Sequence, residues 1–303
     1  MRISSNMIYE TGVKAMQDQQ AALVKNQEQF STGRRVLNPS DDPIASARGL
    51  EMQQSQSIIK QYDANANLVK GNLSLEDGFL GSITSLIQNV QDSAVQAGNP
   101  TIGSVGYEGL GVAVRARYNE LLGLANQKDS SGEYIFSGYY QGSTPPFTQL
   151  SGAGVYVGDQ GQRKIQISPS RQIDANDSGA AVFKPGVAGQ DIFKTLDDLA
   201  NALNSTATPA SVATAVQTAL AELSNELKNV STVRASVGLR LNEIDNAQSI
   251  NSDLTLQYTA TLSSLLDVDP YKIISEMTQR QFNLEASQKT YVQVTSLSMF
   301  KLL

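Results

Sequence analysis

The chain of 303 residues contains no cysteine and no histidine. The absence of cysteine excludes disulfides, thiolate metal sites and thiol nucleophiles. The absence of histidine removes the usual general base and the most frequent neutral metal ligand. Most hydrolytic active sites therefore lose their central group in this chain.

Charge is also scarce. Charged residues make up 17% of the chain, compared with ~25% in a typical soluble protein, and the net charge is −6. Phosphate binding needs a positive field, but lysine and arginine nowhere form a run longer than a pair such as Arg34-Arg35. We therefore expect no nucleic acid among the partners.

Long apolar runs are missing. No stretch approaches the ~18 consecutive apolar residues of a membrane span, so we expect no membrane insertion. The start Met1-Arg2-Ile3-Ser4 lacks the apolar block of a cleavable signal peptide. Either the protein stays in the cytoplasm or it leaves by a route that cleaves no peptide, and composition does not choose between the two.

Apolar residues recur at alternating intervals of three and four from residue 52 to residue 97, and twelve of the fourteen positions are apolar. This period predicts a long helix with a coiled-coil-like seam. Asp42-Pro43 provides a capping acceptor and a proline suited to the first helical position, and we expect the helix to end before Gly98. The seam positions are Met52, Ser55, Ile59, Tyr62, Ala66, Val69, Leu73, Glu76, Leu80, Ile83, Ile87, Val90, Ala94 and Ala97.

A second seam of the same kind has eleven apolar residues at fifteen positions. Thr208-Pro209 is its start signal, and the segment from Asp267 to Pro270 is its end signal. The two helices, expected at 43–99 and 210–266, are equally long, so we expect them to lie side by side. The seam positions are Val216, Leu220, Leu223, Leu227, Val230, Arg234, Val237, Leu241, Ile244, Gln248, Asn251, Thr255, Tyr258, Leu262 and Leu265.

The two ends of the chain share one pattern: a β-branched residue, Met, Gln, Leu, Gln and an aromatic residue at helical spacing. Thr32-Gly33 predicts the end of the first terminal helix, and Asp269-Pro270 the start of the second. Each seam carries only four apolar residues. We interpret these positions as an assembly interface: Val13, Met16, Gln20, Leu23, Gln27, Phe30, Ile274, Met277, Gln281, Leu284, Gln288 and Tyr291.

Two interpretations of the glutamines in these seams are open. In the first, they form a hydrogen-bonded layer that fixes the register of an ordinary intramolecular pair. In the second, which we prefer, the terminal helices gain their missing burial from neighbouring copies and fold fully only on assembly. The mostly uncharged surface fits the second, because unpaired charges are costly in a polymer core.

The period changes between the long helices. We expect a helix at 104–128, followed by short strands at 134–136, 155–157, 164–167 and 182–183 and a hairpin loop at 158–162. A short helix follows, with Ile192, Leu196, Leu199 and Leu203 on one face. We interpret the aromatic residues as a small hydrophobic core rather than a carbohydrate platform: Tyr134, Phe136, Tyr139, Tyr140 and Phe147.

The order of these elements predicts a mainly α fold. We expect an elongated rod of long antiparallel coiled-coil-like helices formed by both chain ends, with a small central β-rich insert domain. Three domains follow: a terminal helical assembly domain at 1–38 and 268–303, a long-helix rod domain at 39–136 and 188–267, and a small β-rich outer domain at 137–187.

No motif indicates catalysis. Asp41 and Asp42 are neighbouring carboxylates, but they precede Pro43 in a good helix start, so we interpret them as capping residues, like Asp267 and Asp269. The sequence has no Walker loop, no dinucleotide fingerprint and no calcium loop. We expect no enzymatic activity, no cofactor and no metal.

The segment from Thr32 to Pro43 closely resembles the signature loop of bacterial flagellins and their relatives, through Gly33, Arg34, Asn38, Asp41, Asp42 and Pro43. The start Met1-Arg2-Ile3-Ser4 and the stretch from Asp269 to Ser298 resemble the same superfamily. Within it, four segments are similar to the hook-filament junction family, also called the hook-associated protein 3 family: 132–138, 146–147, 155–159 and 179–183.

The resemblance implies a structural adaptor of the bacterial flagellum. Such a protein joins the hook, through hook-associated protein 1, to the flagellin filament, next to copies of itself in a junction ring. The resemblance also implies an extracellular location, type III export without a cleaved signal peptide, and an export chaperone at the C-terminal segment. Two alternatives remain open: a flagellin that builds the filament itself, and a secreted enzyme carried on the central insert.

Overall fold

A computed structural model describes residues 5–129, 131–139, 144–150, 153–203 and 208–300. The chain divides into two compact units. The first contains residues 1–58 and 253–303, and the second contains residues 59–252. Both chain ends therefore belong to one unit and the middle of the chain to the other.

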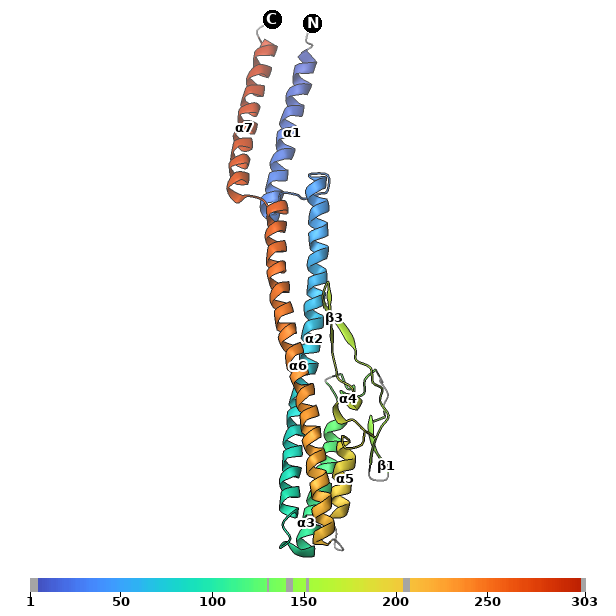
Figure 1. Ribbon diagram of the computed structural model, residues 1–303. Coiled ribbons are helices and arrows are strands. Elements are labelled where there is room, and N and C mark those ends of the chain that lie inside the picture. Colours follow the sequence, from blue (N-terminus) through green and yellow to red (C-terminus); the bar gives the residue numbers. More distant parts are fainter. Residues whose placement is uncertain (1–4, 130, 140–143, 151–152, 204–207, 301–303) are drawn as a thin grey trace. The chain divides into compact units, whose positions relative to one another are not determined.

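The first unit contains the two terminal helices, α1 (Ser5–Thr32) and α7 (Pro270–Phe300), which pack against each other (Figure 1). α1 ends where predicted, and Gly33 follows it with a φ of +69°, a conformation that glycine adopts without strain. α7 begins at Pro270 as predicted, and the Asp269 carboxylate accepts a hydrogen bond from the Tyr271 amide at 2.9 Å. The first part of α2 (Pro43–Ala97) and the last part of α6 (Pro209–Leu266) complete this unit.

The predicted long helices are confirmed as α2 and α6. In the second unit they run antiparallel, and ion pairs join Lys70 to Asp245 at 2.6 Å and Asp77 to Arg234 at 2.8 Å. Every predicted seam position of α2 is buried or half-buried. The same holds for α6 except at Arg234, because this exposed side chain reaches sideways to Asp77. The two seams thus face a core, as their period predicted.

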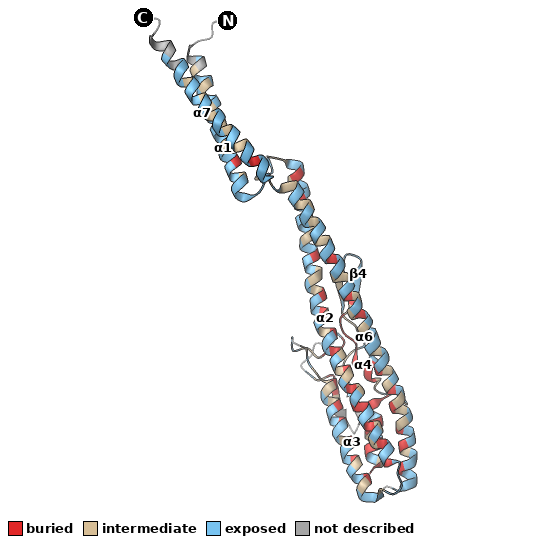
Figure 2. Ribbon diagram, turned by 90° about the vertical axis from the view of Figure 1, so that its left-hand side faces the viewer, coloured by how far each residue is buried: buried red, intermediate tan, exposed pale blue. Residues whose placement is uncertain are grey.

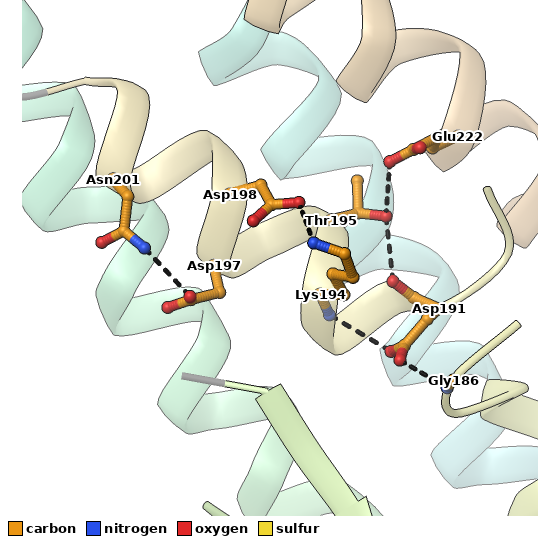
Figure 3. A network of polar contacts seen from close by, with 8 residues as sticks. All are labelled: Gly186, Asp191, Lys194, Thr195, Asp197, Asp198, Asn201 and Glu222. Carbon is orange, nitrogen blue, oxygen red and sulfur yellow. Dashed lines mark hydrogen bonds and ion pairs between the residues drawn. The ribbon is translucent and has the colours of Figure 1, made fainter. Parts of the chain in front are cut away.

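Two further helices complete the bundle of the second unit: α3 (Gly103–Ala125) and α5 (Ile192–Ala202). Both confirm the predicted helices, and the predicted apolar face of α5 is buried, including Leu203 just after its end. Asp191 caps α5, because its carboxylate accepts a hydrogen bond from the Lys194 amide at 3.1 Å (Figure 3). The same carboxylate also accepts a hydrogen bond from the Gly186 amide in the preceding loop at 2.6 Å.

The β region consists of two separate two-stranded antiparallel sheets. β1 (Phe147–Leu150) pairs with β2 (Ala153–Tyr156), and β3 (Lys164–Ser168) pairs with β4 (Arg171–Asp174). The predicted hairpin across 158–162 is therefore wrong, because β2 and β3 each pair with the strand on their other side. A turn of two residues between β3 and β4 closes that hairpin more locally.

Two of the predicted strands are also wrong. Val182 and Phe183 lie in a short helix, α4 (Gly179–Phe183), which Ser178 caps by accepting a hydrogen bond from the Ala181 amide at 3.3 Å. Residues 134–136 form no strand, and Tyr134 makes only an isolated bridge with Lys128. A short apolar run specifies burial, but its length is too small to distinguish strand from helix.

The predicted aromatic core is present, and it also includes residues from outside the β region. Phe136 and Phe147 are buried as predicted, and each meets Phe183 edge to face at ring distances of 5.3 and 5.0 Å. Phe147 also contacts Phe193 of α5 at 5.1 Å, so the β region shares one core with the bundle. The prediction that Tyr139 belongs to this core is wrong, because its side chain is exposed. Tyr140 lies outside the described residues.

The expected mainly α fold is confirmed, with long helices from both chain ends and a small β region in the middle of the chain. Figure 2 shows many buried residues in the bundle of the second unit and few along α1 and α7. Across the described ranges, no helix combines the length and the apolar character of a membrane span.

Candidate assembly interface

The pair of terminal helices α1 and α7 has a thin inner seam. Tyr9 and Tyr291 meet edge to face, with ring centroids 6.2 Å apart and ring planes at 82°. A Cβ atom on Gly12 would lie only 3.0 Å from the Tyr291 ring, so glycine allows the two helices to approach closely here. Tyr9 and Gly12 were not predicted as interface residues.

The seam also contains polar groups. The Asn26 side chain is buried, and with its amide oriented to satisfy both neighbours it donates to the Ala22 carbonyl and accepts from Arg280 Nε at 3.1 Å. Gln19 Oε1 is buried and has no hydrogen-bond partner among the described residues. In α1 and α7, the only residues with described side chains that are fully buried are Asn26 and Ile273. The pair therefore excludes little apolar surface from water.

The structure divides the twelve predicted interface residues between two faces. Five are half-buried between the helices: Met16, Leu23, Met277, Leu284 and Tyr291. Seven are exposed: Val13, Gln20, Gln27, Phe30, Ile274, Gln281 and Gln288. All four glutamines point to solvent, so the interpretation that they form a hydrogen-bonded layer within the pair is wrong.

The outer faces of both helices carry large apolar side chains. Besides the predicted Val13, Phe30 and Ile274, sequence reasoning missed five more on these faces: Met7, Val24, Tyr271, Phe282 and Val292. It also missed Val294, which is exposed at the groove between the two helices. Phe282 is 69% exposed and Tyr271 is 89% exposed. A search for one seam per helix overlooks a second apolar face. The signal that could have revealed it is that Phe282 and Val292 are large apolar residues of the predicted helix that do not belong to its seam. An exposed set of this kind is a candidate interaction surface.

A groove between α1 and α7 opens beside the Tyr291 ring. Its volume is about 510 Å³, and its walls carry no charged residue. The lining residues are Gly12, Ala15 and Gln19 of α1 and Asn283, Ala286, Ser287, Thr290, Tyr291 and Val294 of α7. The short side chains leave space for uncharged side chains of another molecule.

The predicted signature loop connects α1 to α2 and contacts the end of α6 and the segment that follows it. The Arg35 guanidinium donates to the Leu265 carbonyl at the end of α6 at 2.8 Å and pairs with Asp42 at 3.0 Å. The Arg35 amide also donates to the Leu266 carbonyl at 2.7 Å. The Gly33 carbonyl accepts from the Val268 amide at 2.9 Å. The loop thus binds carbonyl groups that the end of a helix leaves without partners.

The two carboxylates of the loop have different roles. Asp42 caps α2 as predicted, because it accepts from the Ala45 amide at 3.0 Å, and this bond together with Arg35 lowers the pKa of Asp42. Asp41 does not cap a helix. It accepts from Lys25 at 2.6 Å and from the Leu37 and Asn38 amides, and these contacts, Lys25 first, lower the pKa of Asp41. Asp41 therefore shapes the loop itself.

The remaining loop residues Arg34 and Asn38 have exposed side chains, and Pro43 is the first residue of α2. Arg34 forms a backbone bridge with Asp267. Among the residues that the structure describes, no group of three or more acidic side chains is arranged to hold a metal ion. The chemistry of this region is packing and hydrogen bonding.

The chain is similar to flagellar proteins of known families. Residues 3–141 match the family model described as the bacterial flagellin N-terminal helical region. The flagellar hook-associated protein 3 of Escherichia coli (strain K12) is 35% identical over 318 aligned residues, covering 100% of this chain and 99% of that protein. The flagellin of Bacillus subtilis (strain 168) is 23% identical, covering 97% of this chain and 96% of that protein.

A solved structure shares the fold. The crystal structure of the flagellar junction protein FlgL from Legionella pneumophila superposes with a TM-score of 0.61 at 22% identity, covering 73% of this chain and 100% of that one. At this identity the likeness shows the fold alone.

Proposed function

The chain belongs to the flagellar hook-associated protein 3 family and has a structural role in the bacterial flagellum, and from this premise we propose that it is the adaptor between hook and filament. On one side it contacts the hook through hook-associated protein 1, on the other side flagellin, and laterally copies of itself. It acts by assembly and performs no catalysis.

The observation that carries this proposal is the apolar outer surface of α1 and α7. Burying one large apolar side chain contributes roughly 1.5–3 kcal/mol, and nine such side chains are exposed on these two helices. The inner seam of the pair excludes little surface, so neighbouring molecules supply the burial that the pair lacks. The twelve predicted interface residues contribute through both faces, the seven exposed ones directly and the five inner ones by holding the pair together.

The proposal also assigns the domains. Residues 1–38 with 268–303 form the assembly domain, residues 39–136 with 188–267 the long-helix domain, and residues 137–187 the β-rich domain that faces outward. We further propose that the protein is exported to the hook-filament junction by type III export, without a cleaved signal peptide. An export chaperone binds the C-terminal segment, and this segment contains the exposed apolar residues Phe282 and Val292.

Flagellin itself is the nearest alternative. A match over the full length at 35% identity to a hook-associated protein 3, compared with 23% to a flagellin, favours the junction role. The enzyme alternative gains no support from Asp159, whose carboxylate accepts from the Tyr139 amide at 2.8 Å and the Gly161 amide at 2.7 Å. Both bonds fold a loop, so this carboxylate is used structurally.

The test is incorporation of purified variants onto hooks that end in hook-associated protein 1. Ile274→Asp places a charge on the outer face of α7, and we expect it to abolish incorporation and the subsequent growth of filament. Ile274→Leu keeps the surface apolar and should incorporate normally.

The matched control is Leu239→Asp, which makes the same type of change at a residue of α6 that is 71% exposed and lies outside the terminal helices. It should incorporate normally. Normal incorporation of Ile274→Asp, or equal loss with Leu239→Asp, contradicts an interface on the terminal helices.

A further inference from the structure

The seam of α2 contains one buried acid. Glu76 lies between the fully buried Leu73 and Leu80, its exposed fraction is 0%, and neither of its carboxyl oxygens has a hydrogen-bond partner among the described residues. An ionised carboxylate without partners is very costly at such a site. Burial raises the pKa of Glu76 well above its ordinary value, the negative charge of Asp177 raises it further, and Arg240 opposes the shift. Burial therefore favours the neutral form of Glu76.

Glu76 faces a buried ion pair between the β region and α6. Arg240 of α6 pairs with Asp177, and both side chains are about nine-tenths buried. Arg240 also donates to the Asp174 carbonyl at 3.1 Å, and Gln162 donates to Asp177 at 2.8 Å. One guanidinium thus stands near two carboxyl groups. The local charges balance only while Glu76 keeps its proton, and the neutral carboxyl can then donate to Asp177.

The other charged groups near Glu76 line one small cavity with it. The Asp129 carboxylate already has hydrogen-bond donors, because it accepts hydrogen bonds from the amides of Ser131 and Glu133 at 2.8 and 3.0 Å. Arg163 lines the same cavity, and its Nε has no hydrogen-bond partner within the described part of the chain. The cavity offers about 10 Å³ to the centre of a water molecule, which is room for a single water. An ionised Glu76 could therefore be hydrated by more than one water only if the surrounding segment opened.

The segment around Asp177 has other attachments to the helices, and three of them are amide contacts that do not titrate. Asn65 of α2 donates to the Gln166 carbonyl at 2.9 Å. From α6, Asn251 donates to the Ile167 carbonyl at 3.3 Å and Asn229 to the Val182 carbonyl at 2.7 Å. An exposed ion pair between Arg171 and Glu243 lowers the pKa of Glu243, so that pair stays ionised above neutral pH. Glu76 differs from these attachments, because it is a buried carboxyl group whose pKa is raised by its surroundings.

From this geometry we propose that Glu76, Asp177 and Arg240 form a proton-operated latch. While Glu76 is neutral, the latch holds segment 160–183, which contains β3, β4 and α4, against α2 and α6. When Glu76 gives up its proton, two carboxylates face one guanidinium, and the segment loosens so that water reaches them.

The sign of the effect follows from the raised pKa. The folded state holds the proton more tightly than the unfolded chain, so the stability that the latch provides is greatest at low pH and falls as the pH rises above the ordinary glutamate value. Opening of the segment itself begins where the folded protein starts to release this proton.

Hydrogen exchange of the full chain, followed by mass spectrometry from pH 6 to pH 10, tests the latch. Glu76→Gln keeps the shape and a hydrogen-bond donor but cannot ionise. At each pH the two proteins have the same intrinsic exchange rates, so their ratio reports opening alone. We expect equal exchange at pH 6 and, at the alkaline end, at least about tenfold faster exchange of residues 160–183 in the wild type than in the variant.

The matched control is Glu226→Gln, which replaces the second buried glutamate, in α6, by a side chain that cannot ionise and should leave the alkaline loosening of residues 160–183 unchanged. Identical pH profiles for the wild type and Glu76→Gln overturn the latch. If Glu76→Gln does not fold, the wild-type profile decides alone. Loosening confined to residues 160–183 supports the latch, and loosening spread evenly over the second unit contradicts it.

Discussion

Single buried carboxyl groups carry an energetic cost that the sequence pattern does not show. Glu226 of α6 is only 3% exposed, and its Oε1 has no hydrogen-bond partner among the described residues. Burial raises the pKa of Glu226 to about 9, the charges of Asp191 and Glu222 raise it further, and Lys184 opposes them. In Figure 3, Glu222 lies within hydrogen-bond distance of the Thr195 hydroxyl. Within the described part of the chain, Glu226 has no such contact, and with a pKa of about 9 it is mostly neutral at pH 7.

This cost predicts how stability depends on pH. Since the pKa of Glu226 is higher in the folded state, its contribution is fully present below about pH 4.5 and is lost as the pH rises towards about 9. Glu226→Gln removes this dependence and should stabilise the protein by about 1–3 kcal/mol at pH 7. Urea unfolding at several pH values measures both effects. A variant whose stability falls with pH as steeply as that of the wild type contradicts the prediction.

At the scale of elements, one glycine sets the distance between two helices. A Cβ atom on Gly111 of α3 would lie 2.1 Å from the Leu203 carbonyl oxygen at the end of α5, so the two helices would have to separate. We expect Gly111→Ala to destabilise the protein by about 1–3 kcal/mol in thermal or urea unfolding.

Gly109, two residues earlier in the same helix, provides the control because a Cβ atom added there would meet nothing within 4 Å. Gly109→Ala should be neutral or stabilising by up to about 1 kcal/mol, since alanine favours the helix. Equal losses at both positions would show that the contact with Leu203 does not decide the outcome.

The helices could be predicted from the sequence and the strand pairing could not. The seam from Met52 to Ala97 repeats over many turns, and Asp42-Pro43 marks its start with a side chain that does cap α2. Such signals are local. Val182 and Phe183 carry no period, so their helix was predicted as a strand. A short strand also carries no signal for the neighbour with which it pairs, so the pairing of β1 with β2 was not predicted.

The candidate interface was predicted in part for the same reason. Leu23 and Leu284 lie on the inner seam as their spacing indicates, but the inner face also contains Gly12 and Asn26, which no apolar pattern selects. Which side of a helix faces its neighbour depends on close approach and on polar pairing across the seam. Phe282 was missed because its face is not covered by any described part of the chain, so it belongs to no seam between helices.

At the scale of the whole molecule, the two units differ in how much surface they exclude from water. The second unit contains a continuous core that links α2, α3, α5 and α6 with the β region. The described parts of α1 and α7 contain only two fully buried side chains, Asn26 and Ile273. Segments with few buried contacts open most readily. We therefore expect the terminal helices to be the least stable part of the isolated molecule.

Leu23→Asp and Leu284→Asp test this division of stability. Each change places a charge on the half-buried seam between α1 and α7. Because this seam buries little apolar surface, a small loss of stability is enough to separate the two helices. We expect either variant to abolish incorporation at the junction and motility, while hydrogen exchange of residues 59–252 stays within about twofold of the wild type, since independent units do not share the penalty. Unchanged motility with either variant would show that the seam is not needed for assembly. Faster exchange throughout the second unit would show that the two units fold as one.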